Sequence, residues 1–145
     1  MKRQGILNSD ISRVLSYMGH TDRICIGDCG LPVPEQTERI DLTVRFGVPS
    51  FMEVLKEVAK DMKIEKIILA EEIKEKNPAM EQEIFQFFDW FETGCETGFK
   101  PAKIETEFVP HAELKKMTGE CKAVIRTGET TPYANIILQS GCIFG

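Results

Sequence analysis

Hydrophobic positions near the start of the chain recur with the spacing of a helix. Apolar residues at positions 11, 14, 15 and 18 follow the i, i+3, i+4, i+7 rule. The run Asn8-Ser9-Asp10 just before them can supply a capping side chain, and Gly19 can end the helix. An amphipathic helix is therefore predicted between these two signals.

Two later segments carry the same periodicity and clear helix starts. Ser50 and Glu53 have capping-box spacing ahead of an apolar stripe over 51–62. Asn77 as cap and Pro78 in the first turn begin a third helix, over 77–94. Phe85 and Trp90 of this helix fall outside its main stripe, which predicts a contact with a second subunit.

Short apolar runs alternate with these helices. They predict strands at 23–27, 65–70, 103–108, 122–126 and 135–141, a weaker one at 41–44, and a short helix at 111–119. This alternation is typical of the α/β class, so we expect a single three-layer α/β/α domain with a largely parallel sheet over residues 1–145. The loop-like stretch 94–103 is expected to join two elements rather than two domains.

Composition narrows the classes of function. The chain has 145 residues, enough for one domain with its own core, and a net charge of -5 that argues against a nucleic-acid partner. Its apolar runs are too short to span a bilayer, and its N-terminus lacks a signal-peptide core. The five cysteines contain no C-x-x-C pair, so reduced thiols and a cytoplasmic location are expected.

Familiar catalytic motifs are missing from the sequence. The run 94–100 lacks phosphate-loop spacing, and no G-x-G-x-x-G follows the first predicted strand. No G-x-S-x-G elbow occurs either, which argues against a serine hydrolase.

The two histidines, His20 and His111, each lie at an element boundary. An imidazole exchanges protons near neutral pH, so either residue suits general acid-base chemistry, and neither has metal-ligand spacing. A capping or surface role is the alternative for both. Asp28 directly follows the first predicted strand, where open α/β sheets place their ligand crevice, although a turn-stabilising role is an equal alternative.

Two other strand ends carry polar residues. Glu71 and Glu72 follow a predicted strand but are interpreted as part of a solvated charged face. The loop 127–135 combines a phenol at Tyr133 with an amide at Asn135, which could hold a sugar by hydrogen bonds and ring stacking. A plain turn is the alternative reading of this loop.

These residues and their flanking motifs resemble the ribose pyranase and fucose mutarotase family. The matching runs extend over nearly the whole chain, at 5–12, 19–34, 39–44, 47–51, 70–74, 77–78 and 123–138. The resemblance implies that His20 is the proton donor and that the sugar is bound by Asp28, His111, Tyr133, Ala134 and Asn135. The runs 28–34 and 132–135 look like the ribose branch, whereas the fucose branch typically carries DAHFP and YGN.

The resemblance implies the interconversion of pyranose and furanose D-ribose for use by ribokinase, without metal or cofactor. Opening a cyclic hemiacetal needs a proton on the ring oxygen while the anomeric hydroxyl loses one, and closing the other ring reverses both transfers. His20 is the predicted acid. The identity of the base stays open, as does a contact from Lys115, one helical turn beyond His111.

His20 and Asp28 flank the same predicted strand. About five extended residues between them span roughly 16 Å, wider than one pentose. If both contact one sugar, either the segment is bent or the two residues come from different subunits. The resemblance implies rings of five subunits stacked into decamers, so we prefer the interpretation that the two residues come from different subunits. The segment 92–103 is longer than in the shortest family members and affects the expected subunit contacts. A non-catalytic sugar-binding protein and a structural or regulatory oligomer are the rival functions.

Overall fold

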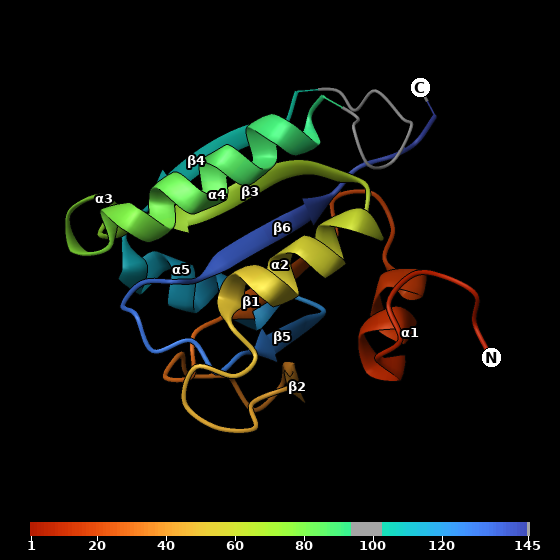
Figure 1. Cartoon of the computed structure of the whole chain (residues 1–145), viewed down its shortest axis with the longest axis horizontal. Helices are drawn as coiled ribbons and strands as arrows, with labels where there is room; N and C mark the ends of the chain where they lie inside the picture. Colours follow the sequence, from red (N-terminus) through yellow and green to blue (C-terminus); the bar gives the residue numbers. More distant parts are fainter. Residues whose placement is uncertain (94–102, 145) are drawn as a thin grey trace.

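The computed structural model describes residues 1–93 and 103–144, so nearly all of the predicted loop at 94–103 lies outside the described residues. Within them, six strands form one sheet in the order β2-β5-β1-β6-β3-β4 (Figure 1). The strands are β1 (Arg23–Gly27), β2 (Glu38–Asp41), β3 (Ile64–Ala70), β4 (Glu105–Val109), β5 (Ala123–Arg126) and β6 (Ile136–Ser140).

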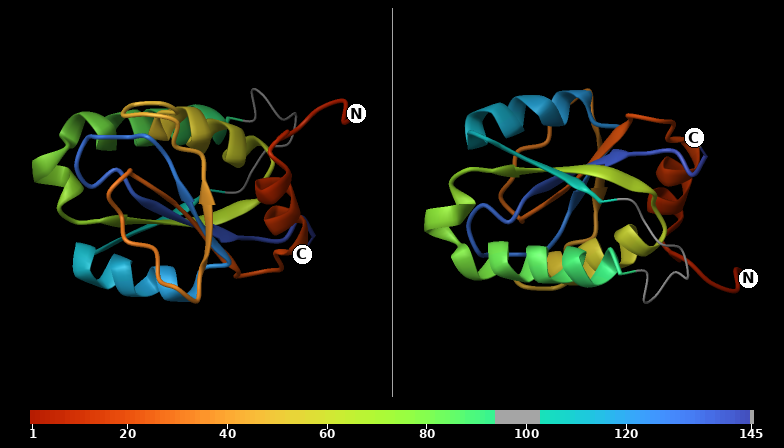
Figure 2. Two further views of the ribbon diagram at one scale, coloured as in Figure 1. Left: turned by 90° about the horizontal axis from the view of Figure 1, so that it is seen from below. Right: turned by 90° about the horizontal axis from the view of Figure 1, so that it is seen from above.

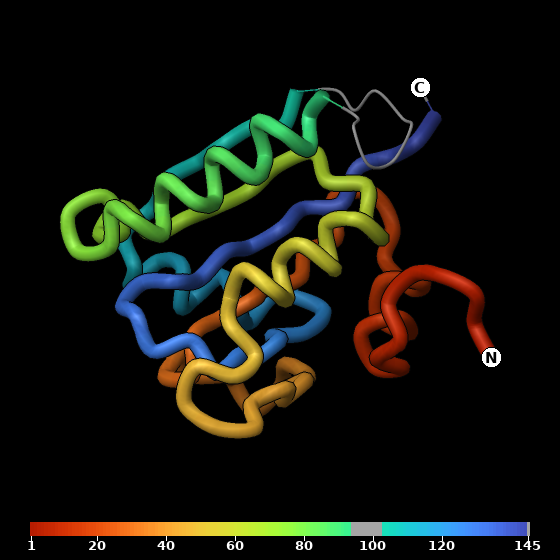
Figure 3. The backbone as a smooth tube through the Cα atoms, viewed as in Figure 1, coloured from red at the N-terminus to blue at the C-terminus, as the bar shows by residue number. Residues whose placement is uncertain are grey.

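The sheet is largely parallel, as the alternation of elements predicted. β1 pairs in parallel with β5, β5 with β2, and β3 with β4, whereas β6 is antiparallel to both β1 and β3. Because β6 is central and reversed, its beginning lies beside the carboxyl end of β1. Figure 3 follows this path from the loop before β6 back to the end of the sheet where α1 lies.

Helices cover both faces of the sheet and give the predicted three layers. α2 (Phe51–Lys60) and α4 (Pro78–Phe91) cover one face, α5 (His111–Met117) covers the other, and α1 (Ser9–Tyr17) packs at one end (Figure 2). A short α3 (Ile73–Lys76) precedes α4, and a single 3-10 turn (Thr118–Glu120) follows α5.

The predicted caps begin three of these helices. The Asn8 side chain accepts from the backbone N–H of Ile11 at 2.9 Å, and Ser50 with Glu53 forms a complete capping box. Asn77 caps α4 ahead of Pro78, whose missing N–H costs nothing in the first turn.

One predicted strand is displaced. The strand predicted at 41–44 is wrong, because β2 covers Glu38–Asp41 and buries Ile40 against the rest of the sheet. Tertiary burial of this isoleucine overrides a weak local pattern. In the charged run after β3, the charged side chains are exposed apart from the half-buried Glu72, while Ile73 between them is fully buried and begins α3.

The core lies on both faces of the sheet. Along β3, Ile67 and Leu69 pack into the larger apolar cluster with α2 and α4, while Ile68 and Ala70 pack into the smaller one with Leu114 of α5. Alternate residues point to opposite faces of a strand, so a sheet covered on both sides requires continuous apolar runs. This burial fixes which residues emerge at each end of the sheet.

Candidate active site

Asp28 and Asn135 form a tightly bonded pair where β1 ends and β6 begins. The fully buried Asn135 accepts from the backbone N–H of Asp28 at 2.9 Å and donates through Nδ2 to Asp28 Oδ2 at 3.1 Å. The other carboxylate oxygen accepts from the N–H of Gly30 at 2.9 Å. Asn135 therefore positions the Asp28 carboxylate, a role that its sequence position alone did not reveal.

The end of β1 has room for this pair only because residue 27 is a glycine. A Cβ on Gly27 would lie 2.7 Å from Leu31 Cδ2 and 3.1 Å from Asn135 Oδ1. The first contact is shorter than packed carbon atoms adopt, and the second requires Asn135 to shift by a few tenths of an ångström. A side chain at this position would displace Asn135 and the carboxylate that it holds.

His111 stands beside this pair at the start of α5. Its backbone N–H donates to both carboxylate oxygens of Glu72, at 3.0 and 3.1 Å, so Glu72 anchors the helix start, a role that was not predicted for it. The imidazole meets the Tyr133 ring edge-on, with centroids 4.9 Å apart. Its buried Nδ1 has no hydrogen-bond partner among the described residues, which indicates a site for a polar ligand atom.

The loop before β6 holds Tyr133 in a strained conformation. Its φ of 57° is left-handed, a region that a tyrosine rarely adopts and that functional sites often retain. The neighbouring Ala134 is fully buried and packs in the large core cluster. Together Asp28, His111, Tyr133, Ala134 and Asn135 are named here the carboxyl-end half-site.

Asn77 ties this loop to α4. Besides capping the helix, its Nδ2 donates to Thr131 Oγ1 at 3.0 Å and to the carbonyl of Pro132 at 2.8 Å. Thr131 also donates to Glu129, whose other oxygen accepts from the N–H of Phe51. The loop that carries Tyr133 is thus fixed from two helices.

We expect Asn77→Ala to lower the free energy of unfolding by about 2 to 3 kcal/mol, because it removes a cap and, in addition, two side-chain hydrogen bonds to the loop. Asn8→Ala is the matched control, since Asn8 caps α1 by a single bond, and about 1 kcal/mol is expected there. Urea unfolding measures both losses. Equal losses would mean that the loop bonds of Asn77 contribute nothing.

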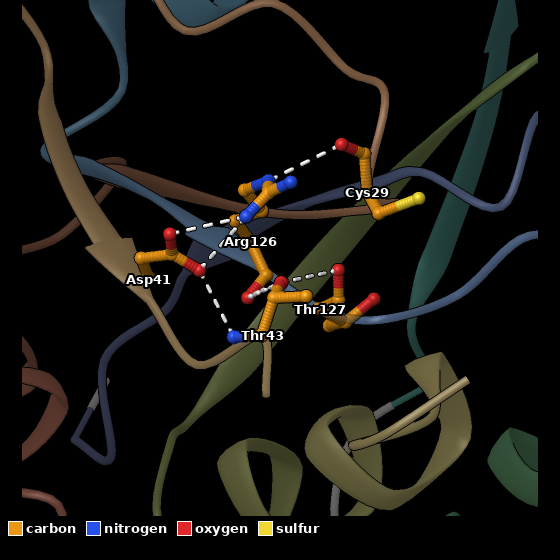
Figure 4. Close-up of polar contacts among 5 residues, drawn as sticks. All are labelled: Cys29, Asp41, Thr43, Arg126 and Thr127. Atoms are coloured by element: carbon orange, nitrogen blue, oxygen red, sulfur yellow. Dashed lines mark hydrogen bonds and ion pairs between the residues drawn. The ribbon is translucent and has the colours of Figure 1, made fainter. Parts of the chain in front are cut away.

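A second group of bonds steadies the loop after β1 (Figure 4). Arg126 donates through Nε to the carbonyl of Cys29 at 3.2 Å and through its NH1 group to Asp41 at 3.1 and 3.2 Å. The buried Thr127 hydroxyl donates to the carbonyl of Gly27 at 2.8 Å. The sequence did not single out Arg126 or Thr127, because their partners lie far away along the chain.

Burial in the carboxyl-end half-site shifts the pKa values of Asp28 and His111 in the direction that favours their neutral forms. Burial raises the pKa of Asp28, against the opposing hydrogen bonds from Gly30 and Asn135. Burial also lowers the pKa of His111, with a smaller contribution from the positive charge of Lys115. Burial therefore disfavours the ionised form of both side chains, a perturbation that is common among the acid-base groups of active sites.

The lowered pKa of His111 predicts a pH-dependent stability. The folded state prefers the neutral imidazole, so this contribution is present above the ordinary value of 6.5 and is lost as the pH falls through the lower folded value. Asp28 acts oppositely and at more acid pH: its contribution is present below 3.8 and is lost as the pH rises through the higher folded value.

Urea unfolding between about pH 5 and pH 8 tests this linkage. We expect the wild-type free energy of unfolding to fall more steeply toward acid pH than that of His111→Gln. Because His20 is present in both proteins, the difference between the two curves isolates His111. Parallel curves would contradict the expected linkage.

The structure places His20 away from all these residues. It precedes β1, whereas Asp28 follows β1, so the five residues of that strand separate them within one chain. The exposed His20 imidazole pairs through Nε2 with Glu65 Oε2 at 2.9 Å, and Thr21 beside it has a left-handed φ of 70°. His20 and Glu65 are named here the His20 half-site.

The described residues form neither a metal-binding cluster nor a disulfide. Residues 1–93 and 103–144 contain no group of three or more His, Cys, Asp or Glu side chains able to hold a metal. Cys25, Cys29, Cys121 and Cys142 are all free, and Cys95 lies outside the described residues. What the described arrangement offers is a carboxylate, two imidazoles and a phenol.

The sequence matches the model of the RbsD / FucU transport protein family over residues 1–143. The chain belongs to this family. It is 50% identical over 144 residues to a D-ribose pyranase of Halalkalibacterium halodurans, a match that covers 99% of this chain and 100% of that protein. A D-ribose pyranase of Lactobacillus acidophilus matches with the same identity and coverage.

A solved member of the family has the same fold. The structure of Bacillus subtilis RbsD complexed with D-ribose is 42% identical and superposes with a TM-score of 0.88, covering 99% of this chain and 100% of that one. The mixed sheet and its helical layers are therefore those of the RbsD and FucU family.

Proposed function

We propose that this protein is a D-ribose pyranase, an isomerase that interconverts the pyranose and furanose forms of D-ribose. The observation that carries the proposal is the carboxyl-end half-site, where the carboxylate of Asp28 and the unpartnered Nδ1 of His111 lie beside Tyr133. These groups can hold sugar hydroxyls and pass protons. Full-length relatives at 50% identity are D-ribose pyranases, which supports ribose as the substrate.

In this proposal His20 is the general acid that protonates the ring oxygen, while the anomeric hydroxyl loses its proton and the ring opens. Asp28, His111 and Tyr133 bind the sugar, with Ala134 shaping the loop and Asn135 holding the carboxylate in place. The open-chain aldehyde then closes through a different hydroxyl, and both proton transfers run in reverse. The reaction consumes no cofactor, metal or redox partner.

The proposal requires two subunits at each site, since one chain places His20 and Asp28 at opposite ends of β1. A head-to-tail contact of this kind closes into a ring, and we propose five-membered rings stacked as a decamer. We also propose a subunit contact at a groove of about 530 Å³ between α2 and α4, where Trp90 lies. The groove is lined by Met52, Lys56, Lys60, Glu83, Gln86, Phe87 and Trp90. None of these residues belongs to either half-site.

The cellular setting proposed here is cytoplasmic, with residues 1–145 acting as a single domain that supplies ribose for phosphorylation by ribokinase. The net charge of -5 is consistent with a partner other than nucleic acid. Within the described residues, no helix is both long and apolar enough to cross a membrane.

NMR saturation transfer on D-ribose tests the proposed function. The protein should accelerate exchange between the pyranose and furanose forms of D-ribose and act much less on L-fucose under the same conditions. If ribose binds while its exchange rate stays unchanged, the protein is a sugar-binding protein and not an enzyme. If ribose causes no thermal shift at all, a structural or regulatory oligomer is the better account.

A further inference from the structure

We infer that Glu65 is a positioning residue for His20, which fixes the imidazole through Nε2 and leaves Nδ1 as the nitrogen that exchanges a proton with the sugar. This inference deepens the proposed function and rests on it for the role of His20. It assigns a function to a glutamate that the sequence pattern did not distinguish from the other acidic residues.

The carboxylate of Glu65 lies in a chain of hydrogen bonds across three neighbouring strands. Arg23 of β1 donates through Nε to Gln139 Oε1 at 2.9 Å, and Gln139 of β6 donates through Nε2 to Glu65 Oε1 at 2.8 Å. The second oxygen of Glu65 pairs with His20 Nε2 at 2.9 Å. One oxygen is thus held by the sheet while the other orients the imidazole.

The backbone is adapted to aim this side chain. The register between β3 and β6 shifts at Glu65, because Ile64 pairs with Ser140 whereas Lys66 already pairs with Gln139. Such a bulge turns one side chain out of the regular alternation and recurs beside active sites. A Cβ on Gly141 would come within 3.0 Å of Glu65 Cβ, so a glycine there keeps the space that Glu65 occupies.

The contact also determines which imidazole nitrogen carries the proton. An ionised carboxylate only accepts hydrogen bonds, so His20 must donate to it through Nε2–H. The pKa of Glu65 is held below its ordinary value by the bond from Gln139 and then by that from His20, which keeps the carboxylate anionic. His20 Nδ1 has no partner among the described residues and stays available.

The proton balance of the proposed step follows from this geometry. With His20 protonated, Nδ1–H gives its proton to the ring oxygen as the bond from that oxygen to the anomeric carbon breaks. The anomeric hydroxyl gives its proton to a base, and its oxygen becomes the carbonyl of the open chain. When the other ring closes, the attacking hydroxyl gives its proton to Nδ1 and the base returns its proton to the carbonyl oxygen, which becomes the new anomeric hydroxyl. The proton on Nε2 stays there throughout, hydrogen-bonded to Glu65.

The first test reads the tautomer directly and needs no catalysis. The chain has two histidines, so His111→Asn leaves His20 as its single imidazole. Long-range proton–nitrogen NMR spectra of the nitrogen-15-labelled protein, recorded where His20 is neutral, should show a protonated Nε2 and a bare Nδ1. Adding Glu65→Ala should yield a mixture of the two tautomers. A predominant Nδ1–H form in the presence of Glu65 would overturn the inference.

The second test separates positioning from binding. Glu65→Ala should lower the maximal rate of ribose exchange by about 10- to 100-fold, part of the contribution of a positioned acid, while the apparent KM changes by less than about 2-fold. Glu107→Ala is the matched control, because this glutamate of β4 pairs with Lys66 and lies outside the proposed site. The exchange rate of this variant should equal that of wild type.

An unchanged maximal rate in Glu65→Ala would refute the inference and leave the proposed function standing. If the wild-type protein showed no exchange activity, the proposed function would be refuted. The NMR spectra of the His20 tautomer would still show whether Glu65 orients the imidazole.

Discussion

Replacing His20 by alanine should slow the catalysed exchange of ribose ring forms by about 100- to 10,000-fold, the range that a positioned general acid contributes. Stability should hardly change, within about 0.5 kcal/mol, because the side chain is 52% exposed and its pair with Glu65 lies at the surface. Saturation transfer measures the rate, and thermal unfolding shows that the variant is folded.

The control for this variant is Lys122→Ala, which truncates another exposed side chain beside β1 that lies 3.9 Å from Asp22. Its exchange rate should equal that of wild type. Near-normal activity in His20→Ala would remove His20 from the mechanism and leave the acid to be sought in the carboxyl-end half-site.

Mixing two inactive variants should restore activity if each site takes His20 from one subunit and Asp28 from its neighbour. In an equal mixture of His20→Ala and Asp28→Asn chains that assemble at random, about a quarter of the sites combine an intact His20 with an intact Asp28. The expected recovery is therefore about a quarter of the wild-type rate after the two chains are co-refolded.

A matched mixture distinguishes this arrangement from a site within one chain. Wild type mixed with the double variant should also give about a quarter of the sites if two subunits contribute, but about half if one chain makes the whole site. In the one-chain case the two single variants would recover nothing. The pair of mixtures therefore reports the geometry even when the absolute rates are uncertain.

Local signals were sufficient for most of the fold. Asn8, the Ser50 and Glu53 box, and Asn77 with Pro78 all begin helices where the sequence predicted them. Their hydrogen bonds join residues three apart, so they are written in a few consecutive letters. The misplaced strand at 41–44 had no such signal, and its position depends on how Ile40 pairs with Ile125 of β5.

The sequence predicted which residues belong to the candidate site but only part of how they are arranged in space. Asp28 was singled out because it follows a predicted strand, and His111 because it lies at an element boundary. Three residues were missed because each acts through a partner far away along the chain. Glu72 bonds to His111, 39 residues away, and Arg126 bonds to Asp41, 85 residues away. Glu65 pairs with His20, 45 residues away. A charged residue in a mixed run carries no local mark of such a partner.

By itself, the sequence determined the order and type of the elements, the starts of the main helices and the residues able to move protons, because periodicity and capping are short-range properties. The tertiary structure alone decided which of those residues meet. The reversed central strand β6 brings Asn135 to Asp28 across 107 positions, and the same sheet holds His20 at its opposite end. Strand order and register depend on which apolar faces bury together, and that choice is made by the whole chain.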